Sequence, residues 1–177
     1  MNTYNTMKKK LLLILIIICI TFIFFNSLKS AEQSIKESGK VAEFIEKAVV
    51  AIYKGNPPEK VAYFFKITFG NVLRDFAHFF EFFILGILVM LYSDKFKVSV
   101  FRRFVFALLF CILIALLDET IQLFFQGRAF ELSDLALDGL GSMAGSMLIL
   151  LLWRIIKSKK YKKEEEYLKN KNSSAGG

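Results

Sequence analysis

The chain has 177 residues, of which 55% are hydrophobic and 23% are charged, and its formal net charge at pH 7 is +8. A mean hydropathy of +0.46 is too high for an ordinary soluble domain, and the apolar residues occur in long blocks. The basic residues flank these blocks without any nucleic-acid recognition motif, so nucleic acid is excluded as a partner. The composition predicts an all-α polytopic membrane domain over residues 1–160 and a charged tail over 161–177.

The first apolar block covers residues 11–28 and directly follows three lysines, Lys8, Lys9 and Lys10. It is long enough to cross a bilayer, and only a weak small-residue motif for signal-peptide cleavage follows it. We therefore expect an uncleaved membrane span, with the amino terminus in the cytoplasm, rather than a signal peptide.

The region after this span has a mixed composition of lysine, glutamate and apolar residues. Within it Val41, Ile45, Val49 and Ile52 recur at helical spacing. This pattern predicts an extracytoplasmic amphipathic helix over residues 31–53, lying at the membrane surface or against the other helices. The alternative is a solvated helical linker. Two prolines at 57–58 end the helix.

Three further apolar blocks predict spans over 75–92, 104–125 and 134–153. The loop between the second and third spans holds four basic residues and one acidic residue, and a lysine-rich tail follows the fourth span. By the positive-inside rule both segments are cytoplasmic, so both termini are expected inside. Ser133 or Asp134 is expected to cap the fourth span, and the tail is expected to be disordered.

Charged and polar residues gather at one end of each of the last three spans. The nine candidate ligand-binding residues are Arg74, His78 and Glu81 near the start of the second span, Asp118, Glu119 and Gln122 near the end of the third, and Arg128, Asp134 and Asp138 around the start of the fourth. With the predicted topology, all three groups lie in the extracytoplasmic half of the membrane at similar depth. Ionisable side chains at membrane depth are costly unless they are paired or face water, so we interpret them as one functional site.

The spacing of these residues resembles that of the VanZ-like family of small bacterial membrane proteins. The matching motifs are Arg74-x-x-x-His78-x-x-Glu81 with Leu85-Gly86, then Asp118-Glu119-x-x-Gln122 with Gly127-Arg128, and then Asp134 with Gly141 and Gly145. The resemblance covers residues 74–150, and residues 27–41 are more weakly similar to a serine-rich stretch after the family's first span. Two positions depart from the family pattern, since Phe82 stands where Tyr is common and Asp138 where Asn is common.

The resemblance implies a protein of the bacterial cytoplasmic membrane. Some family members are associated with resistance to teicoplanin-type glycopeptides, so the resemblance also implies a role in such resistance. The first hypothesis is an envelope protein whose site binds the lipoglycopeptide or a lipid-linked cell-wall precursor, next to membrane lipids. The second is an enzyme acting on a lipid or polyprenyl-phosphate head group, with Glu119, His78 or Asp134 as acid or base and Arg74 or Arg128 on the phosphate. The third is a structural protein held together by internal ion pairs.

Other features of the sequence predict packing rather than chemistry. Cys19 and Cys111 lie within apolar blocks without metal-ligand spacing, and we expect both to be packing residues. The carboxylates suit Mg²⁺, but no dedicated spacing indicates a metal site, and no cofactor is identified. Gly141 and Gly145 form a small-xxx-small pair that lets another backbone approach closely, and a homo-oligomer through this face is one possible use.

Overall fold

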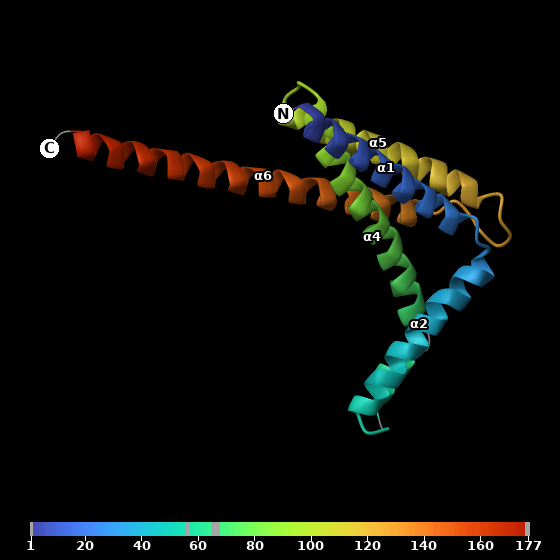
Figure 1. Cartoon of the computed structure of the whole chain (residues 1–177). Helices are drawn as coiled ribbons and strands as arrows, with labels where there is room; N and C mark the ends of the chain where they lie inside the picture. Colours follow the sequence, from blue (N-terminus) through green and yellow to red (C-terminus); the bar gives the residue numbers. More distant parts are fainter. Residues whose placement is uncertain (1, 56, 65–67, 176–177) are drawn as a thin grey trace.

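A computed structural model describes residues 2–55, 57–64 and 68–175, and within these ranges the chain is helical with no strand. The elements are α1 (Asn2–Ser27), α2 (Ala31–Ile52), α3 (Glu59–Tyr63), α4 (Phe69–Tyr92), the short 3-10 helix η2 (Ser93–Lys95), α5 (Val100–Gln122) and α6 (Leu132–Ala175). In Figure 1, α1, α4, α5 and the first part of α6 form a bundle, α2 lies beside the first half of α4, and the rest of α6 projects alone. The predicted all-α fold class is confirmed.

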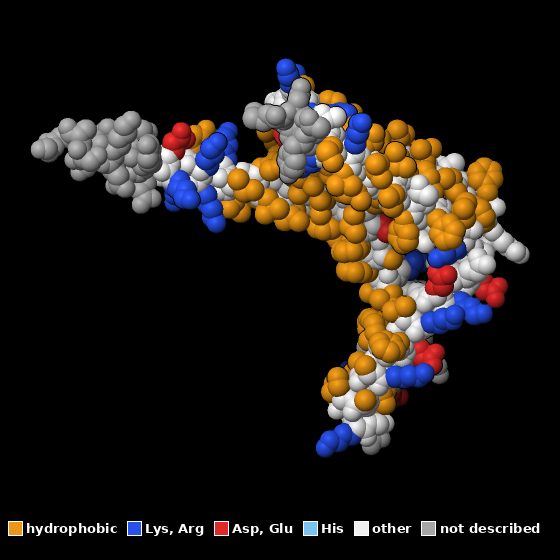
Figure 2. Space-filling view, viewed as in Figure 1, with side chains coloured by type: hydrophobic (Ala, Val, Ile, Leu, Met, Phe, Trp, Pro, Cys, Tyr) orange, Lys and Arg blue, Asp and Glu red, His pale blue; other side chains and the backbone are white. Residues whose placement is uncertain are grey.

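Four helices are long and apolar enough to cross a membrane: Thr6–Ser27, Phe69–Lys95, Val100–Gln122 and Leu132–Glu165. They contain or closely overlap the four predicted spans. Apolar side chains cover much of the outside of the bundle (Figure 2), including Leu109, Leu113 and Leu117 of α5. An apolar outer surface of this extent suits contact with lipid rather than water.

The interior of the bundle is apolar towards the middle and end of α4. Phe82, Leu85 and Met90 of α4 are fully buried, together with Cys111 of α5. Cys19 packs against the same cluster, so the packing role predicted for both cysteines is confirmed. Because Phe82 lies in this apolar core, a hydroxyl at its position would need a buried hydrogen-bond partner.

Helices α4 and α6 cross at very short range because glycines lie at the crossing. A Cβ atom on Gly145 would overlap the carbonyl group of Phe83, and one on Gly141 would overlap that of Phe79. Ser146 Oγ donates a hydrogen bond to the Gly86 carbonyl oxygen across the same interface, at 3.3 Å. The predicted close approach is therefore confirmed, but its partner is α4 of the same chain. A homo-oligomer through the Gly141/Gly145 face would require this interface to open.

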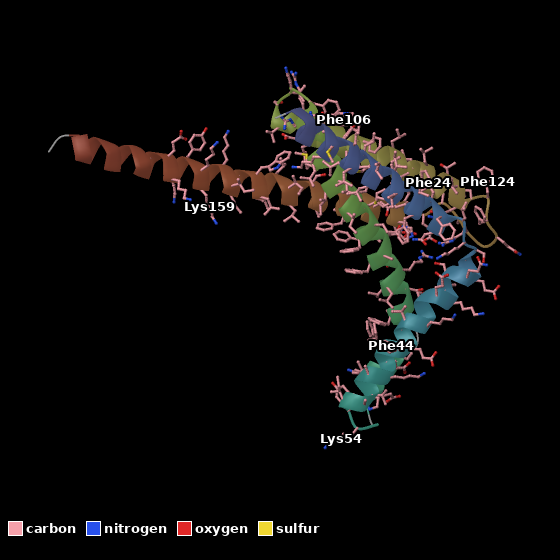
Figure 3. The ribbon with its side chains drawn as sticks, viewed as in Figure 1. Phe24, Phe44, Lys54, Phe106, Phe124 and Lys159 are labelled. Carbon is pink, nitrogen blue, oxygen red and sulfur yellow. The ribbon has the colours of Figure 1, made fainter. Side chains whose placement is uncertain are left out.

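Helix α2 begins with a capping box. Ser30 Oγ accepts a hydrogen bond from the Gln33 backbone nitrogen at 3.3 Å, and Gln33 Oε1 accepts one from the Ser30 nitrogen at 3.2 Å. The helix ends at Ile52, one residue from the predicted boundary. In Figure 3, Phe44 lies on α2 and Lys54 lies just after its end. Both are far from Phe106 and Phe124, which lie near the two ends of α5. Helix α2 packs against α4, as one of the two predicted arrangements requires.

Helix α6 differs from its prediction at both ends. It begins at Leu132, so Ser133 and Asp134 lie inside its first turn rather than at its cap. It continues to Ala175, past the predicted end at 153 and through the segment expected to be disordered. The lysines and glutamates of this segment are good helix formers, and no glycine or proline interrupts them before the end of the helix. The extension is therefore a continuous charged helix.

Candidate functional site

The ends of four helices meet on one side of the bundle. The carboxyl ends of α1 and α5 and the amino-terminal halves of α4 and α6 bring the three predicted polar groups together, although they are far apart in the chain. Asp118, Glu119, Asp134 and Asp138 are each no more than 2% exposed. The convergence expected from the topology is thus present in the structure.

Arg74 connects α4 to the start of α6. Its Nη2 donates hydrogen bonds to Glu131 Oε2 at 3.0 Å and to Asp134 Oδ2 at 3.2 Å. The Asp134 side chain is 3% exposed, so this ion pair is screened from water on one side. Glu131, which precedes α6, was not among the predicted site residues. Only its place between Arg128 and Asp134 indicated a role.

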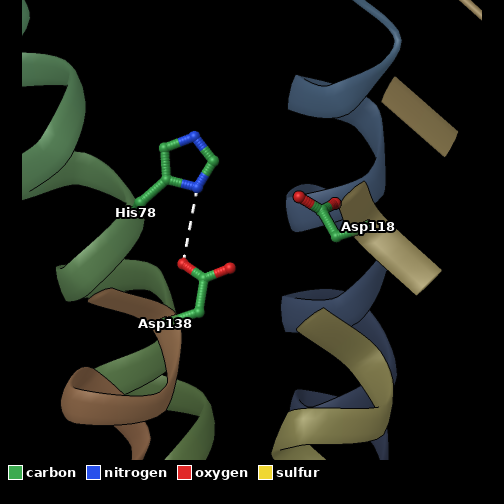
Figure 4. Close-up of side chains that lie close together, drawn as sticks. All are labelled: His78, Asp118 and Asp138. Carbon is green, nitrogen blue, oxygen red and sulfur yellow. Dashed lines mark ion pairs between the residues drawn. The ribbon is translucent and has the colours of Figure 1, made fainter. Parts of the chain in front are cut away.

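His78 lies between two aspartates of α6. Its Nδ1 is 3.4 Å from Asp138 Oδ1 (Figure 4). Its Nε2 is 3.9 Å from Asp134 Oδ2. Among the described residues, His78 Nδ1 and both carboxylate oxygens of Asp138 are buried without a hydrogen-bond partner. The imidazole is therefore close to two carboxylates but is not held by aligned hydrogen bonds.

Asp118 and Glu119 of α5 are held by neutral donors. Ser27 Oγ donates to Asp118 Oδ1, and Gln122 Nε2 donates to Asp118 Oδ2 at 3.0 Å. Gln122 Nε2 also contacts Glu119 Oε1 at 3.2 Å, while Glu119 Oε2 accepts a hydrogen bond from the Glu131 backbone nitrogen at 2.9 Å. Glu119 thus fixes the connection between α5 and α6.

The end of α1 supplies two further site residues that were not predicted. Asn26 Nδ2 donates a hydrogen bond to Glu81 Oε1 at 2.7 Å, and Ser27 contacts Asp118 as described. Both residues are polar and lie at the end of an apolar block. Polar residues are ordinary there because the block ends at the membrane interface, so the position alone does not indicate a site. Ser27 did begin the serine-rich stretch on which part of the family resemblance depends.

A cavity of about 380 Å³ opens beside this cluster, between the end of α1, the first half of α2 and the first half of α4. Five of the nine predicted residues line it: Arg74, His78, Glu81, Gln122 and Arg128. Asp118, Glu119, Asp134 and Asp138 are not among its lining residues and are buried. The predicted site is therefore divided into a cavity wall and a set of buried carboxylates.

Arg128 lies at the cavity wall without a carboxylate in direct contact. Its Nε donates to the Lys29 carbonyl oxygen at 3.4 Å, and among the described residues no carboxylate oxygen lies within ion-pair distance of it. Burial lowers the pKa of Arg128 from its ordinary value, and the positive charge of Arg74 lowers it further. The carboxylates of Asp134, Glu119 and Glu131 act on Arg128 in the opposite direction, so its charge is balanced by nearby acidic groups without a direct ion pair.

Four membrane-length helices with a shared polar end define a multi-pass membrane protein with a buried charged site. A family model described as VanZ/LLP1 matches residues 12–154, and the chain belongs to this family. The match includes residues 12–27 of α1 and all nine predicted site residues. No curated protein and no solved structure matches the chain.

Proposed function

We propose that this VanZ-family membrane protein contributes to resistance against teicoplanin-type glycopeptides by binding the polar head of an amphiphile in the cavity beside α4. The amphiphile is either the lipoglycopeptide itself or a lipid-linked cell-wall precursor. The basic loop 93–103 supports an extracytoplasmic position for the cavity under the positive-inside rule, and both molecules are found on that side.

The observation that carries this proposal is that Arg74 and Arg128 both line the cavity, and that Arg128 has no carboxylate within ion-pair distance among the described residues. Guanidinium groups bind phosphate or carboxylate with paired, charge-assisted hydrogen bonds. An anionic group placed between the two arginines would reduce their mutual repulsion. Lys29 also lines the cavity, but it already forms an ion pair with Glu37 at 2.7 Å.

The same cavity has an apolar side that suits the lipid part of such a molecule. Val41 of α2 and Leu73, Phe76 and Ala77 of α4 line it. Val41 and Phe76 are 50% and 59% exposed, so they extend the apolar surface outwards from the cavity. A charged pocket that continues into an apolar surface matches a ligand with an anionic head and an acyl or prenyl chain.

A membrane enzyme is the second candidate, and His78 is the observation that favours it. This imidazole lines the cavity and lies within 4 Å of carboxylate oxygens of Asp134 and Asp138. An imidazole positioned by a carboxylate is a common general base. In this reading Asp138 and Asp134 would orient His78, and the arginines would hold the phosphate of the head group.

The proposal is tested with the purified protein in nanodiscs and two fluorescent probes, a labelled teicoplanin and a labelled polyprenyl diphosphate. We expect saturable binding of at least one probe and weakened binding in Arg128→Gln. Lys54→Gln is the matched control, because this exposed cation lies at the far end of α2. Binding of neither probe, or equal binding by Arg128→Gln, would contradict the proposal. A new lipid species detected by mass spectrometry after incubation would favour the enzyme.

A further inference from the structure

We infer that His78, Asp118 and Asp138 form a binding site for one divalent transition-metal ion, either Zn²⁺ or Mn²⁺. Each residue offers one ligand atom, and these atoms all lie within 4.8 Å of one another. They come from three helices, α4, α5 and α6, and Figure 4 shows them facing a common space. The inference does not depend on the proposed ligand, because Asp118 and Asp138 are buried away from the cavity and only His78 lines it.

The carboxylate of Asp138 is an observation separate from the clustering. Its side chain is 0% exposed, it points towards His78, and neither of its oxygens has a hydrogen-bond partner among the described residues. Buried polar atoms normally have a partner, because leaving one unsatisfied costs about 1–3 kcal/mol, and more for a charged group. The facing nitrogen of His78 is likewise buried and without a hydrogen-bond partner. A cation between these atoms would satisfy all of them.

Charge balance leads to the same site. Four carboxylates are buried here. Among the described residues, Asp134 has Arg74 within ion-pair distance, Asp138 has only the imidazole of His78, and Asp118 and Glu119 have no cationic side chain at that distance. Asp118 receives hydrogen bonds only from Ser27 and Gln122, which are neutral. Buried charges without a counter-charge are strongly destabilising. A divalent ion between Asp118 and Asp138 would offset two of them.

The distances require only a small contraction. A cation at the centre of an equilateral triangle with 4.8 Å sides lies about 2.8 Å from each corner, against roughly 2.0–2.2 Å for zinc bonds to imidazole and carboxylate. The difference is less than about 1 Å for each ligand atom. The hydrogen bonds that Ser27 and Gln122 donate to Asp118 would orient this ligand, as outer contacts do in metal sites.

The ligand types favour a transition metal over Ca²⁺ or Mg²⁺. The latter two prefer oxygen ligands alone, whereas an imidazole nitrogen together with carboxylate oxygens suits Zn²⁺ and Mn²⁺. Three protein ligands also leave at least one coordination position for water or another group. A metal held by three helices would also join α5 to α6 at the point where the carboxylates of Asp118 and Asp138 face each other.

The test uses the full-length protein, purified in detergent with a histidine-free tag and stripped of metal with a chelator. After dialysis against Zn²⁺, Mn²⁺, Ca²⁺ or Mg²⁺, we expect one equivalent of Zn²⁺ or Mn²⁺ to be retained and the thermal unfolding temperature to rise with it. Asp138→Asn and Asp118→Asn should each bind at least about tenfold more weakly, since even outer contacts contribute tenfold or more. Glu43→Gln is the control, because this carboxylate is 63% exposed on α2.

A second readout does not depend on the variants being folded. His78 is the only histidine in the chain, so nitrogen hyperfine coupling in the pulsed EPR spectrum of the Mn²⁺-loaded wild-type protein would come from its imidazole. Coupling with one bound equivalent supports the site. Failure to retain either metal, retention without the nitrogen coupling, or unchanged retention by a folded Asp138→Asn would overturn the inference and leave protons to neutralise the carboxylates. None of these results depends on the drug or lipid probes.

Discussion

Arg74 of α4 and Asp134 of α6, which are 60 positions apart, form an ion pair in which the arginine uses a single nitrogen. The same Nη2 donates to Asp134 Oδ2 at 3.2 Å and to Glu131 Oε2 at 3.0 Å. A lysine ammonium group can make both contacts as a point donor, because the planar fork of the guanidinium is not needed for them. The pair therefore positions α6 against α4 without requiring an arginine.

This geometry separates the two arginines of the cavity in a substitution experiment. Arg74→Lys should keep normal membrane abundance and retain most ligand binding. Arg128→Lys should bind about tenfold more weakly, a loss of roughly 1.4 kcal/mol, because Arg128 has no carboxylate within ion-pair distance among the described residues and only its Nε is engaged, by the Lys29 carbonyl oxygen. Probe binding, teicoplanin susceptibility and protein abundance would be measured for both. Full resistance in Arg128→Lys would contradict the anion site.

Glu119→Gln is expected to destabilise the protein rather than to remove a chemical group from the cavity. Both Glu119 oxygens accept hydrogen bonds, from Gln122 and from the Glu131 backbone, and a glutamine amide would place a donor against one of these donors. One buried mismatch costs about 1–3 kcal/mol. The measurement is thermal unfolding together with membrane abundance. Normal stability with lost resistance would instead make Glu119 the working carboxylate.

Gly145→Ala should weaken the crossing of α4 and α6. The added methyl group meets the backbone of Phe83, which cannot move aside like a flexible side chain, so we expect a loss of about 1–3 kcal/mol. Gly139→Ala is the matched control on the same helix, because no atom lies within 4 Å of its added Cβ. The control should be neutral or stabilise the helix by up to about 1 kcal/mol. Equal unfolding temperatures for the two variants would show that the crossing tolerates the methyl group.

The orientation in the membrane is predicted from the basic residues alone. In a background without native cysteines, Lys97→Cys should be protected from an impermeant thiol reagent added to intact cells, and Phe130→Cys should be labelled. The loop containing Lys97 is basic, and Phe130 is 39% exposed in the connection between α5 and α6. The reverse labelling pattern would place the site on the cytoplasmic side and remove the basis for an extracytoplasmic ligand.

Much of the site could be predicted because topology constrains position along the membrane normal. Once the spans and their directions are set, Arg74, Asp118 and Asp134 must lie at the same end of the bundle, and the structure places them there. Rotation of each helix about its axis is set by side-chain packing, which the spacing of charged residues does not reveal. For this reason the division between cavity wall and buried carboxylates, and the facing of His78 towards Asp138, were not predicted.

The residues that were missed have a related explanation. Asn26 and Ser27 lie at the end of the first span, where polar residues are ordinary, and their partners Glu81 and Asp118 are 55 and 91 positions away. Contacts of this kind depend on which helices are neighbours. The helix that packs against Gly141 and Gly145 could not be predicted for the same reason. Small residues predict that another helix packs closely, but they do not indicate which helix it is.

The length of α6 determines how its charges act outside the membrane. At 1.5 Å per residue its 44 residues extend about 66 Å, whereas the hydrocarbon core of a bilayer is about 30 Å thick. If α6 stays straight and perpendicular to the membrane, most of its lysines lie more than the Debye length of about 8 Å from the membrane surface. At that distance the surface potential of anionic lipids is screened. Only the basic residues of the first exposed turns, such as Arg154 and Lys157, would then anchor the helix electrostatically, and the remainder would be presented to the aqueous phase at a fixed height.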